Sequence, residues 1–384
     1  MKTNKEKMNK ILQELDSYKK RDYNFSSGRI LGSMCTQPHP IANLAYSRFI
    51  DTNIGDPELF PGLKEIQSKL INFTSDLLQA PSTSAGHIVG GGTEGNITAI
   101  WLAKKLTGKN EIVISDNAHF SFEKISSLMD IKLKKVPVTD NYIMDVSKIK
   151  NYVNKKTAAV VGIAGSTELG TIDPLPELSD ICFDEHIFLH VDAAFGGYII
   201  PFLQKLNYSV SNFDFRLSGV STISIDAHKM GYSAIPLGIL LLRDKEWLNK
   251  ISVESPYISS RKHAGLFGTR SGGPVAAAYA VYKYLGIEGY KKMVKNCMNV
   301  TKYTQQKISE IGLNLVTEPT LNVLGVKLKN LNEVFSNLLY YGWRVNKIER
   351  LSCIRIVVMP QITKKIIDEF IPVLKKVCNK VGEI

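Results

Sequence analysis

A lysine and an aspartate, each placed at the end of an apolar run, are the residues of this 384-residue chain best suited to chemistry. Lys229 stands directly after His228 in the stretch SIDAHKMG, and Asp192 ends the apolar run in HVDAA. A lysine amine can form a Schiff base with an aldehyde, and an acid can keep a pyridine nitrogen protonated so that the ring accepts electrons. The pair therefore predicts an enzyme that uses pyridoxal 5'-phosphate (PLP).

We expect burial beside apolar or cationic groups to lower the pKa of Lys229 and make its amine a better nucleophile. Three residues close to Lys229 or Asp192 in the sequence are further candidates. His228 is a candidate contact for the cofactor phosphate or a substrate carboxylate, and Asp226 is a further cofactor-binding candidate. Ala194 is small enough to allow close approach to a ring. The alternatives are a surface lysine in a loop and an aspartate that caps a helix.

The motif Gly90–Asn96, GGGTEGN, precedes a helical pattern. Glycines let the backbone approach an anion closely, and a helix N-terminus offers free N–H groups and partial positive charge. Thr93 and Glu94 are the cofactor-binding candidates within the motif. Because no GK[ST] follows, the motif is not a Walker A loop. The alternative is a glycine-rich turn in which Thr93 is an ordinary N-cap.

Three further motifs each contribute one candidate. His119 in SDNAHFS is placed to stack on a pyridine ring, although a lone loop histidine is also compatible with a structural role. Thr167 in GSTELGTID is a candidate hydrogen-bond partner of the cofactor or of the aspartate region, or a turn residue. Thr269 in GTRSGG is a candidate phosphate contact from a neighbouring subunit, with a lid or a plain turn as alternatives.

The elements that must position these residues follow an alternating pattern. Strand candidates are 111–115, 131–136, 158–163, 187–191, 222–225 and 237–242, and helical stretches such as 95–106 and 120–129 separate several of them. Alternation of β and α elements predicts an α/β fold with a mostly parallel sheet covered on both faces. Ligands bind outside the carboxyl ends of such strands, where Asp192 and Lys229 are expected.

The chain divides into three predicted parts. Residues 1–62 comprise a helix over 1–20 and a long irregular segment, 28–62, that we expect to line the site. Residues 63–285 form the large PLP-binding domain. Residues 286–384 form a small α+β domain with helices at 287–311 and 363–381 and strands at 322–327 and 353–359. Arg355 on the last strand is a candidate to bind a substrate carboxylate bidentately, or a structural arginine at a domain boundary.

Composition excludes several function classes. The net charge of +12 comes from scattered short clusters without a nucleic-acid-binding motif, so we predict a Lys-rich surface that aids solubility and no nucleic-acid partner. No apolar run is long enough to span a bilayer, so no membrane association is expected. Five widely spaced cysteines without a CxxC pair argue against a disulfide framework and against a zinc or other metal site. A reducing cytoplasm fits this usage best.

In this order the motifs resemble those of the group II PLP-dependent decarboxylases, which have the PLP fold type I (aspartate-aminotransferase-like). The resemblance runs from about residue 30 to the C-terminus and is strongest to the archaeal L-tyrosine/L-aspartate decarboxylase family of methanogens. The motifs that carry it are SMCTQPHP, NIGDP, GGGTEGN, DNAHFS, STELGTIDPL, HVDAAFGG, SIDAHKMG and GTRSGG.

The resemblance implies roles for individual residues. It assigns Lys229 to the Schiff base, Asp192 to the pyridine nitrogen, His119 to ring stacking and Thr93 to the phosphate. It also implies a homodimer with active sites at the subunit interface. The implied reactions are L-tyrosine to tyramine, for methanofuran biosynthesis, and L-aspartate to β-alanine, for coenzyme A biosynthesis; the sequence leaves both open.

One departure from the family leaves the proton donor open. Animal aromatic amino-acid decarboxylases carry a longer mobile loop with a catalytic tyrosine, whereas the corresponding stretch here, 255–263, is short. The donor to the substrate Cα therefore remains open between Tyr257, His263 and His119. Competing functions are another PLP-dependent lyase, similar to sphingosine-phosphate lyase or cysteine desulfurase, and a non-catalytic binding protein on the same fold.

Overall fold

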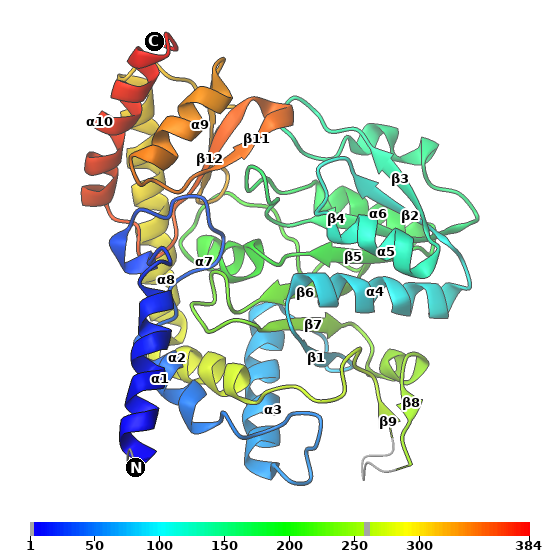
Figure 1. Ribbon diagram of the computed structural model, residues 1–384. Helices are drawn as coiled ribbons and strands as arrows, with labels where there is room; N and C mark the ends of the chain where they lie inside the picture. The colour runs from blue at the N-terminus through cyan, green and yellow to red at the C-terminus, as the bar shows by residue number, and fades with distance from the viewer. Residues whose placement is uncertain (1–3, 257–261) are drawn as a thin grey trace.

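A seven-stranded, mostly parallel sheet forms the centre of the molecule (Figure 1). The computed structural model describes residues 4–256 and 262–384. The strand order is β1-β7-β6-β5-β4-β2-β3, and only β7 runs antiparallel to its neighbours. The strands are β1 Ala85–Val89, β2 Glu111–Ser115, β3 Lys132–Val136, β4 Thr157–Ile163, β5 Phe188–Asp192, β6 Val220–Asp226 and β7 Gly238–Leu242. The predicted α/β class with a mostly parallel sheet is confirmed.

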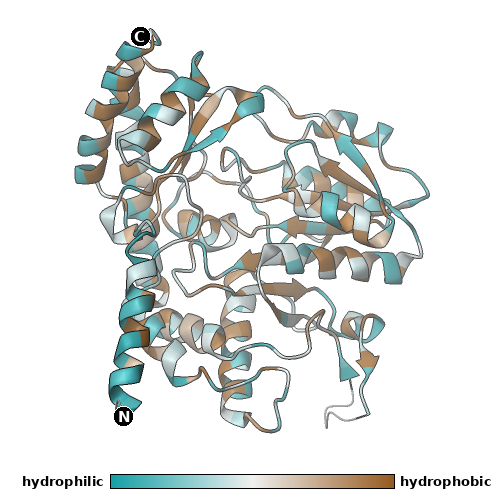
Figure 2. Cartoon of the chain, viewed as in Figure 1, coloured by the Kyte–Doolittle hydropathy of each residue, from teal (hydrophilic) through white to brown (hydrophobic). Residues whose placement is uncertain are grey.

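Helices cover both faces of this sheet, and its central strands β4, β5, β6 and β7 are accordingly buried along their whole length and mostly brown in Figure 2. Two helices pack on one face, α4 Gly92–Thr107 and α5 Ser121–Met129. The other face is covered by α3 Pro61–Leu77, α6 Leu175–Asp184, α7 Ile200–Lys205 and the first part of α8 Gly273–Glu310.

A second, smaller sheet lies near the C-terminal end of α8 (Figure 1). Its order is β10-β12-β11, and α9 and α10 accompany it; the bounds are β10 Val323–Lys327, α9 Leu331–Tyr340, β11 Asn346–Ile348, β12 Cys353–Val357 and α10 Lys364–Lys380. Its separate apolar core contains Trp343 and Phe370, whose ring centroids lie 5.0 Å apart, and Leu31 from the N-terminal segment joins it. The predicted small α+β unit is thus present, while the three-part division of the chain stays a prediction.

The N-terminal region differs from its prediction in one respect. Helix α1, Asn4–Lys19, is confirmed, but the segment expected to be irregular contains α2, Pro40–Arg48. Pro40 suits the first turn of a helix, and the His39 side chain caps it by accepting the Ile41 N–H at 3.3 Å. The helix was not predicted because it is short and because glycines, prolines and asparagines surround it.

Short elements complete the chain. A small hairpin pairs β8 Val253–Glu254 with β9 Lys262–His263. The 3₁₀ helices are Phe25–Ser27, Val146–Asn151, Gly196–Tyr198, Lys245–Lys250 and Glu349–Leu351. Across the described ranges 4–256 and 262–384, no helix is long and apolar enough to cross a membrane, and no cluster of three or more His, Cys, Asp and Glu side chains is placed to hold a metal ion.

Candidate active site

A cavity of about 470 Å³ lies where three parallel strands end. The last residues of β4, β5 and β6, namely Ile163, Asp192 and Asp226, all line it, as does the first turn of α4. Nine residues singled out from the sequence share this cavity: Thr93, Glu94, His119, Thr167, Asp192, Ala194, Asp226, His228 and Lys229. The sheet therefore gathers residues that are up to 136 positions apart in the chain into one site.

Lys229 is held inside the cavity by a carboxylate. Its Nζ lies 3.1 Å from Oδ2 of Asp226, and the same oxygen lies 3.7 Å from Nε2 of His228. The expectation of a lowered pKa for Lys229 is wrong for this state. Burial does lower that pKa, but the charges of Asp226 and Asp192 and the bond to Asp226 raise it by more, so the net shift is upward.

Asp192 is 8 % exposed and is fixed by two donors. Its Oδ1 accepts the Ala194 N–H at 3.1 Å, and its Oδ2 accepts from Nδ2 of Asn96 at 2.8 Å. A carboxylate has about four lone-pair positions, so acceptor capacity remains for a cation in the cavity. The alternative role as a helix cap is not seen, because the 3₁₀ helix that follows has no side-chain cap bond.

The glycine loop makes room at the start of α4. Gly91 has φ +141°, a conformation that side chains rarely adopt, and a Cβ on Gly92 would lie 2.9 Å from the Cβ of Ala194. No side chain caps α4, so its first N–H groups are free to bind an anion. Thr93 lies within the first turn and Gly91 is the N-cap, so the N-cap alternative for Thr93 is wrong.

Glu94 is also bound to this loop. Its Oε2 accepts the Gly90 N–H at 2.6 Å, and burial raises the pKa of its carboxyl group. The cavity thus offers an amine from Lys229, an acid from Asp192, a wall that includes the small Ala194, and the uncapped N-terminus of α4 as an anion site. This set of donors and this shape fit PLP.

His119 lines the same cavity from the segment before α5. Its Nδ1 accepts the Ser121 N–H at 3.2 Å, which places the ring proton of the neutral form on Nε2. Burial lowers the pKa of His119, although the nearby Asp192 opposes this. A neutral ring suits the predicted stacking on the cofactor.

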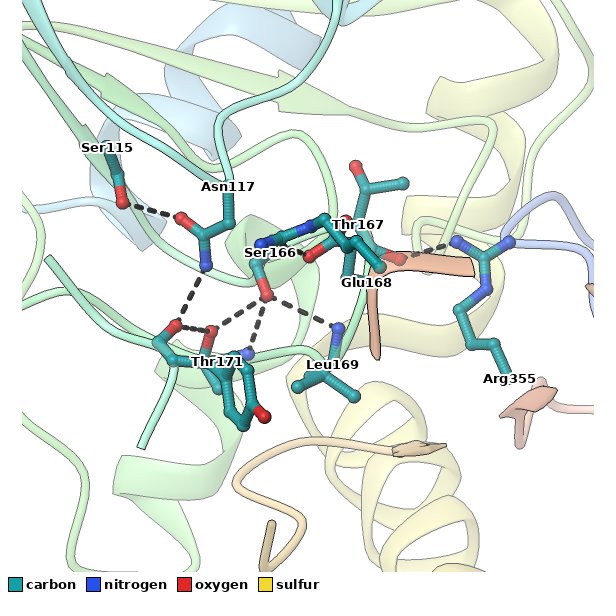
Figure 3. Close-up of polar contacts among 10 residues, drawn as sticks. Ser115, Asn117, Ser166, Thr167, Glu168, Leu169, Thr171 and Arg355 are labelled. Atoms are coloured by element: carbon teal, nitrogen blue, oxygen red, sulfur yellow. Dashed lines mark hydrogen bonds and ion pairs between the residues drawn. The ribbon is translucent and has the colours of Figure 1, made fainter. Parts of the chain in front are cut away.

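Thr167 is carried by a loop that buried polar groups anchor to the large sheet (Figure 3). Ser166 Oγ lies 2.8 Å from Thr171 Oγ1 and accepts the Thr171 N–H at 3.1 Å. The Thr171 hydroxyl and the Asn117 amide both donate to the Tyr142 carbonyl, at 2.9 and 2.8 Å. Ser166 and Thr171 are therefore fixed at the two ends of this loop.

Two arginines from the small unit bind Thr167 and Glu168 in the same loop. Nη1 of Arg355, on β12, donates to the Thr167 carbonyl (Figure 3), and its Nη2 donates to the Gly32 carbonyl at 2.6 Å. Arg350 makes a two-pronged ion pair with Glu168, with Nε 2.6 Å from Oε1. The position of Thr167 at the cavity thus depends on the position of the small sheet.

We expect Arg350→Met to weaken cofactor binding modestly. A partly exposed ion pair contributes at most about 1 kcal/mol, so the dissociation constant of PLP should rise by about two- to fivefold. Lys347→Met is the matched control, because it removes the Lys347–Glu349 pair, at 2.6 Å, from the same part of the small sheet without touching the loop. Equal PLP affinity in wild-type protein and Arg350→Met would refute the coupling.

Among the described residues, three predicted ones are not among those that line the cavity. Arg355 has both terminal nitrogens on backbone carbonyls, so its substrate role stays a prediction. Thr269 is exposed on the loop before α8, and His263 lies on β9. Tyr257 falls outside the described residues.

Asn96 and His190 are site residues that the sequence did not reveal. Both lie in motifs that drew attention for other residues, GGGTEGN and HVDAA. Asn96 holds Asp192, and Nε2 of His190 lies 2.9 Å from Oδ1 of Asn96. A histidine within an apolar strand was the available signal, because a buried ring nitrogen requires a hydrogen-bond partner.

The buried His190 predicts acid sensitivity of the fold. Burial lowers its pKa from 6.5 to about 4, so between these values the unfolded chain binds a proton that the folded chain does not. The free energy of unfolding should therefore fall with decreasing pH, with about 2 kcal/mol of the loss at pH 5 due to this residue. Urea denaturation at pH 7 and pH 5 should show a smaller acid loss for His190→Gln than for wild-type protein; equal losses would contradict this.

Comparisons with known proteins agree with this geometry. Residues 39–329 match the pyridoxal-dependent decarboxylase conserved domain. The chain is 42% identical over 348 residues to a probable L-tyrosine/L-aspartate decarboxylase of Methanothermobacter thermautotrophicus, covering 90% of this chain and 96% of the relative. It is also 42% identical over 375 residues to an L-aspartate/L-glutamate decarboxylase of Pyrococcus horikoshii, covering 96% and 97%.

A solved structure shows the same fold. The sphingosine-1-phosphate lyase of Burkholderia pseudomallei superimposes with a TM-score of 0.89 at 25% identity, covering 99% of this chain and 91% of that one. The predicted PLP fold type I is therefore confirmed, as is the predicted cofactor. With an amine, an acid and an anion-binding loop in one cavity and these relatives over nearly its whole length, the chain belongs to the pyridoxal-dependent decarboxylase family and is a PLP-dependent amino-acid decarboxylase.

Proposed function

We propose that this enzyme decarboxylates L-tyrosine to tyramine and L-aspartate to β-alanine. The observation that carries the proposal is the convergence of Lys229, Asp192 and His119 on one cavity. Apolar side chains also line it, among them Ile97, Phe120, Leu266 and Phe267, and they favour an aromatic substrate. Aspartate is included because relatives of similar identity are named aspartate decarboxylases.

Each residue has a proposed task. Lys229 supplies the amine that holds the cofactor aldehyde, and Asp192 accepts a hydrogen bond from the pyridine nitrogen. Thr93, Glu94 and the α4 N-terminus would hold the phosphate, His228 would contact the phosphate or the substrate carboxylate, and Asp226 would be a further cofactor contact. When bound, PLP supplies a conjugated ring that accepts the electron pair released as CO₂ leaves.

The remaining tasks are to orient the substrate and to return a proton to Cα. We propose that Arg355 contributes its unpartnered Nε, which is buried, to the environment of the substrate carboxylate. The proton donor stays open between Tyr257, His263 and His119. Of the two histidines, His119 is the one that lines the cavity of a single chain.

A second copy of the chain completes the site in this proposal. Phe120 and Phe267 line the cavity although they are 59 % and 60 % exposed, as expected for a wall that a partner subunit covers. In such a homodimer, Thr269 would reach the phosphate of the neighbouring site. A cytoplasmic location is proposed because all five cysteines are free thiols, and the products would enter methanofuran and coenzyme A biosynthesis.

Product analysis tests the substrate choice. Purified enzyme with PLP is given L-tyrosine and L-aspartate separately and then together, with L-glutamate as a third substrate, and tyramine, β-alanine and γ-aminobutyrate are quantified. We expect tyramine and β-alanine, and each substrate should inhibit turnover of the other because both use one cavity. Formation of γ-aminobutyrate alone, or of none of the three amines, would overturn the proposed substrates.

A further inference from the structure

A chain of four buried side chains leads from strand β6 to the carboxylate of Asp192. Thr222 Oγ1 lies 2.9 Å from Nδ1 of His190, and Nε2 of His190 lies 2.9 Å from Oδ1 of Asn96. Asn96 Nδ2 then donates to Asp192 Oδ2 at 2.8 Å. Thr222 and His190 are completely buried and Asn96 is 1 % exposed, so water does not compete for these bonds.

The direction of every hydrogen bond in this chain is determined. Asn96 Nδ2 donates to both Asp192 and the hydroxyl of Ser121, at 2.8 and 3.0 Å, which uses both amide hydrogens. Oδ1 of Asn96 must therefore accept, so Nε2 of His190 carries the ring proton. Burial lowers the pKa of His190 to about 4, so the ring is neutral at pH 7 and its Nδ1 accepts from the Thr222 hydroxyl.

A neutral relay of this kind fixes geometry without adding charge. Asp192 is held by Asn96 on one oxygen and by the Ala194 N–H on the other, which sets the plane of its carboxylate. Because His190 is uncharged, the negative charge of Asp192 remains available to a cation in the cavity. Outer partners that orient a functional group in this way commonly change ligand affinity by 10- to 100-fold.

We infer that Asn96 and His190 are positioning residues that aim the Asp192 carboxylate at the cofactor ring nitrogen. The inference rests on the proposed role of Asp192. Asn96 would thus act on the acid at the ring nitrogen, although it belongs to the glycine-rich motif whose backbone is the candidate to hold the phosphate. His190 acts through Asn96 and does not touch the cofactor.

The test measures equilibrium affinity rather than turnover. Cofactor-free protein is titrated with PLP and with an analogue in which carbon replaces the ring nitrogen. Asn96→Ala should bind PLP about tenfold more weakly than wild type and should bind the analogue with unchanged affinity. Equal weakening toward both compounds would show a general structural role and overturn the inference.

Two further variants test the relay itself. His190→Phe should weaken PLP binding, and the double variant with Asn96→Ala should be no weaker than Asn96→Ala alone, because both act on one carboxylate. His190→Gln keeps a donor for Oδ1 of Asn96 and should retain most of the affinity. Additive losses in the double variant would contradict a relay.

A matched control and a spectroscopic readout complete the design. Thr98→Val alters another completely buried polar side chain on α4 whose hydroxyl makes no hydrogen bond, and it should leave both affinities unchanged. Nitrogen NMR of labelled histidine should show the Nε2-protonated form of His190 in cofactor-free protein; an Nδ1-protonated form would overturn the inference. If wild-type protein binds PLP and the analogue equally, the proposed role of Asp192 fails instead.

Discussion

Lys229→Ala should abolish decarboxylation. The variant lacks the amine that holds the cofactor aldehyde, and loss of a covalent catalyst of this kind should lower kcat by about 10³-fold or more. The change also leaves Asp226 without its partner at 3.1 Å, in a position where the carboxylate is 2 % exposed. Removing one member of a buried ion pair costs about 3–5 kcal/mol, so the cofactor-free variant should unfold at lower urea concentration.

A similar pair elsewhere in the chain provides the control. Lys291 lies 3.0 Å from Glu288, also three positions away, on the exposed side of α8. Lys291→Ala removes a lysine from such a pair without reaching the cavity and should keep wild-type activity.

In wild-type protein, borohydride reduction should fix the cofactor to the peptide that contains Lys229. Near-native turnover by Lys229→Ala would reject the assignment.

Asp192→Asn should have the second largest effect. The amide keeps the shape of the side chain but removes the negative charge that balances a protonated ring nitrogen. Losing one partner of a buried charge pair costs about 3–5 kcal/mol, which corresponds to a roughly 10²- to 10⁴-fold decrease in kcat/KM. Steady-state kinetics with saturating PLP measure this decrease.

Asp214→Asn is the matched control for this variant. Asp214 is a completely buried carboxylate with its own cationic partner, Arg216 at 2.7 Å, and it is not among the residues that line the cavity. This variant should lose stability but keep its turnover number. If Asp192→Asn and Asp214→Asn lost the same small amount of activity, Asp192 would be a structural residue only.

Local patterns predicted the elements that carry the chemistry. The six expected strands of the large sheet appear within two residues of their predicted bounds. Five of them are mainly apolar runs, and 131–136 alternates apolar residues with lysines in part. Asp192 and Lys229 were identifiable because each follows such a run, and the carboxyl ends of parallel strands meet at one edge. Strand β1 was missed because glycine and histidine interrupt its five residues, AGHIV, and leave no continuous apolar run.

Features that depend on three-dimensional neighbours were not predictable in the same way. The raised pKa of Lys229 results from Asp226 and Asp192, and their combined effect against burial depends on distances that a sequence does not contain. The roles of Asn96 and His190 depend on the packing of α4 over β5. Arg355 was recognised as a candidate, but only the fold shows that it ties the Thr167 loop to the N-terminal segment.

Removal of the α-carboxyl group of an amino acid in this cavity can be followed with an isotope. The most direct measurement follows the label from L-tyrosine and L-aspartate that carry ¹³C in the α-carboxyl carbon, with wild-type enzyme and PLP. The label should appear as CO₂, in equal amount to the tyramine or β-alanine formed, and Lys229→Ala should release none. Label that stays in a keto acid or an aldehyde, or CO₂ release that persists without Lys229, would contradict it.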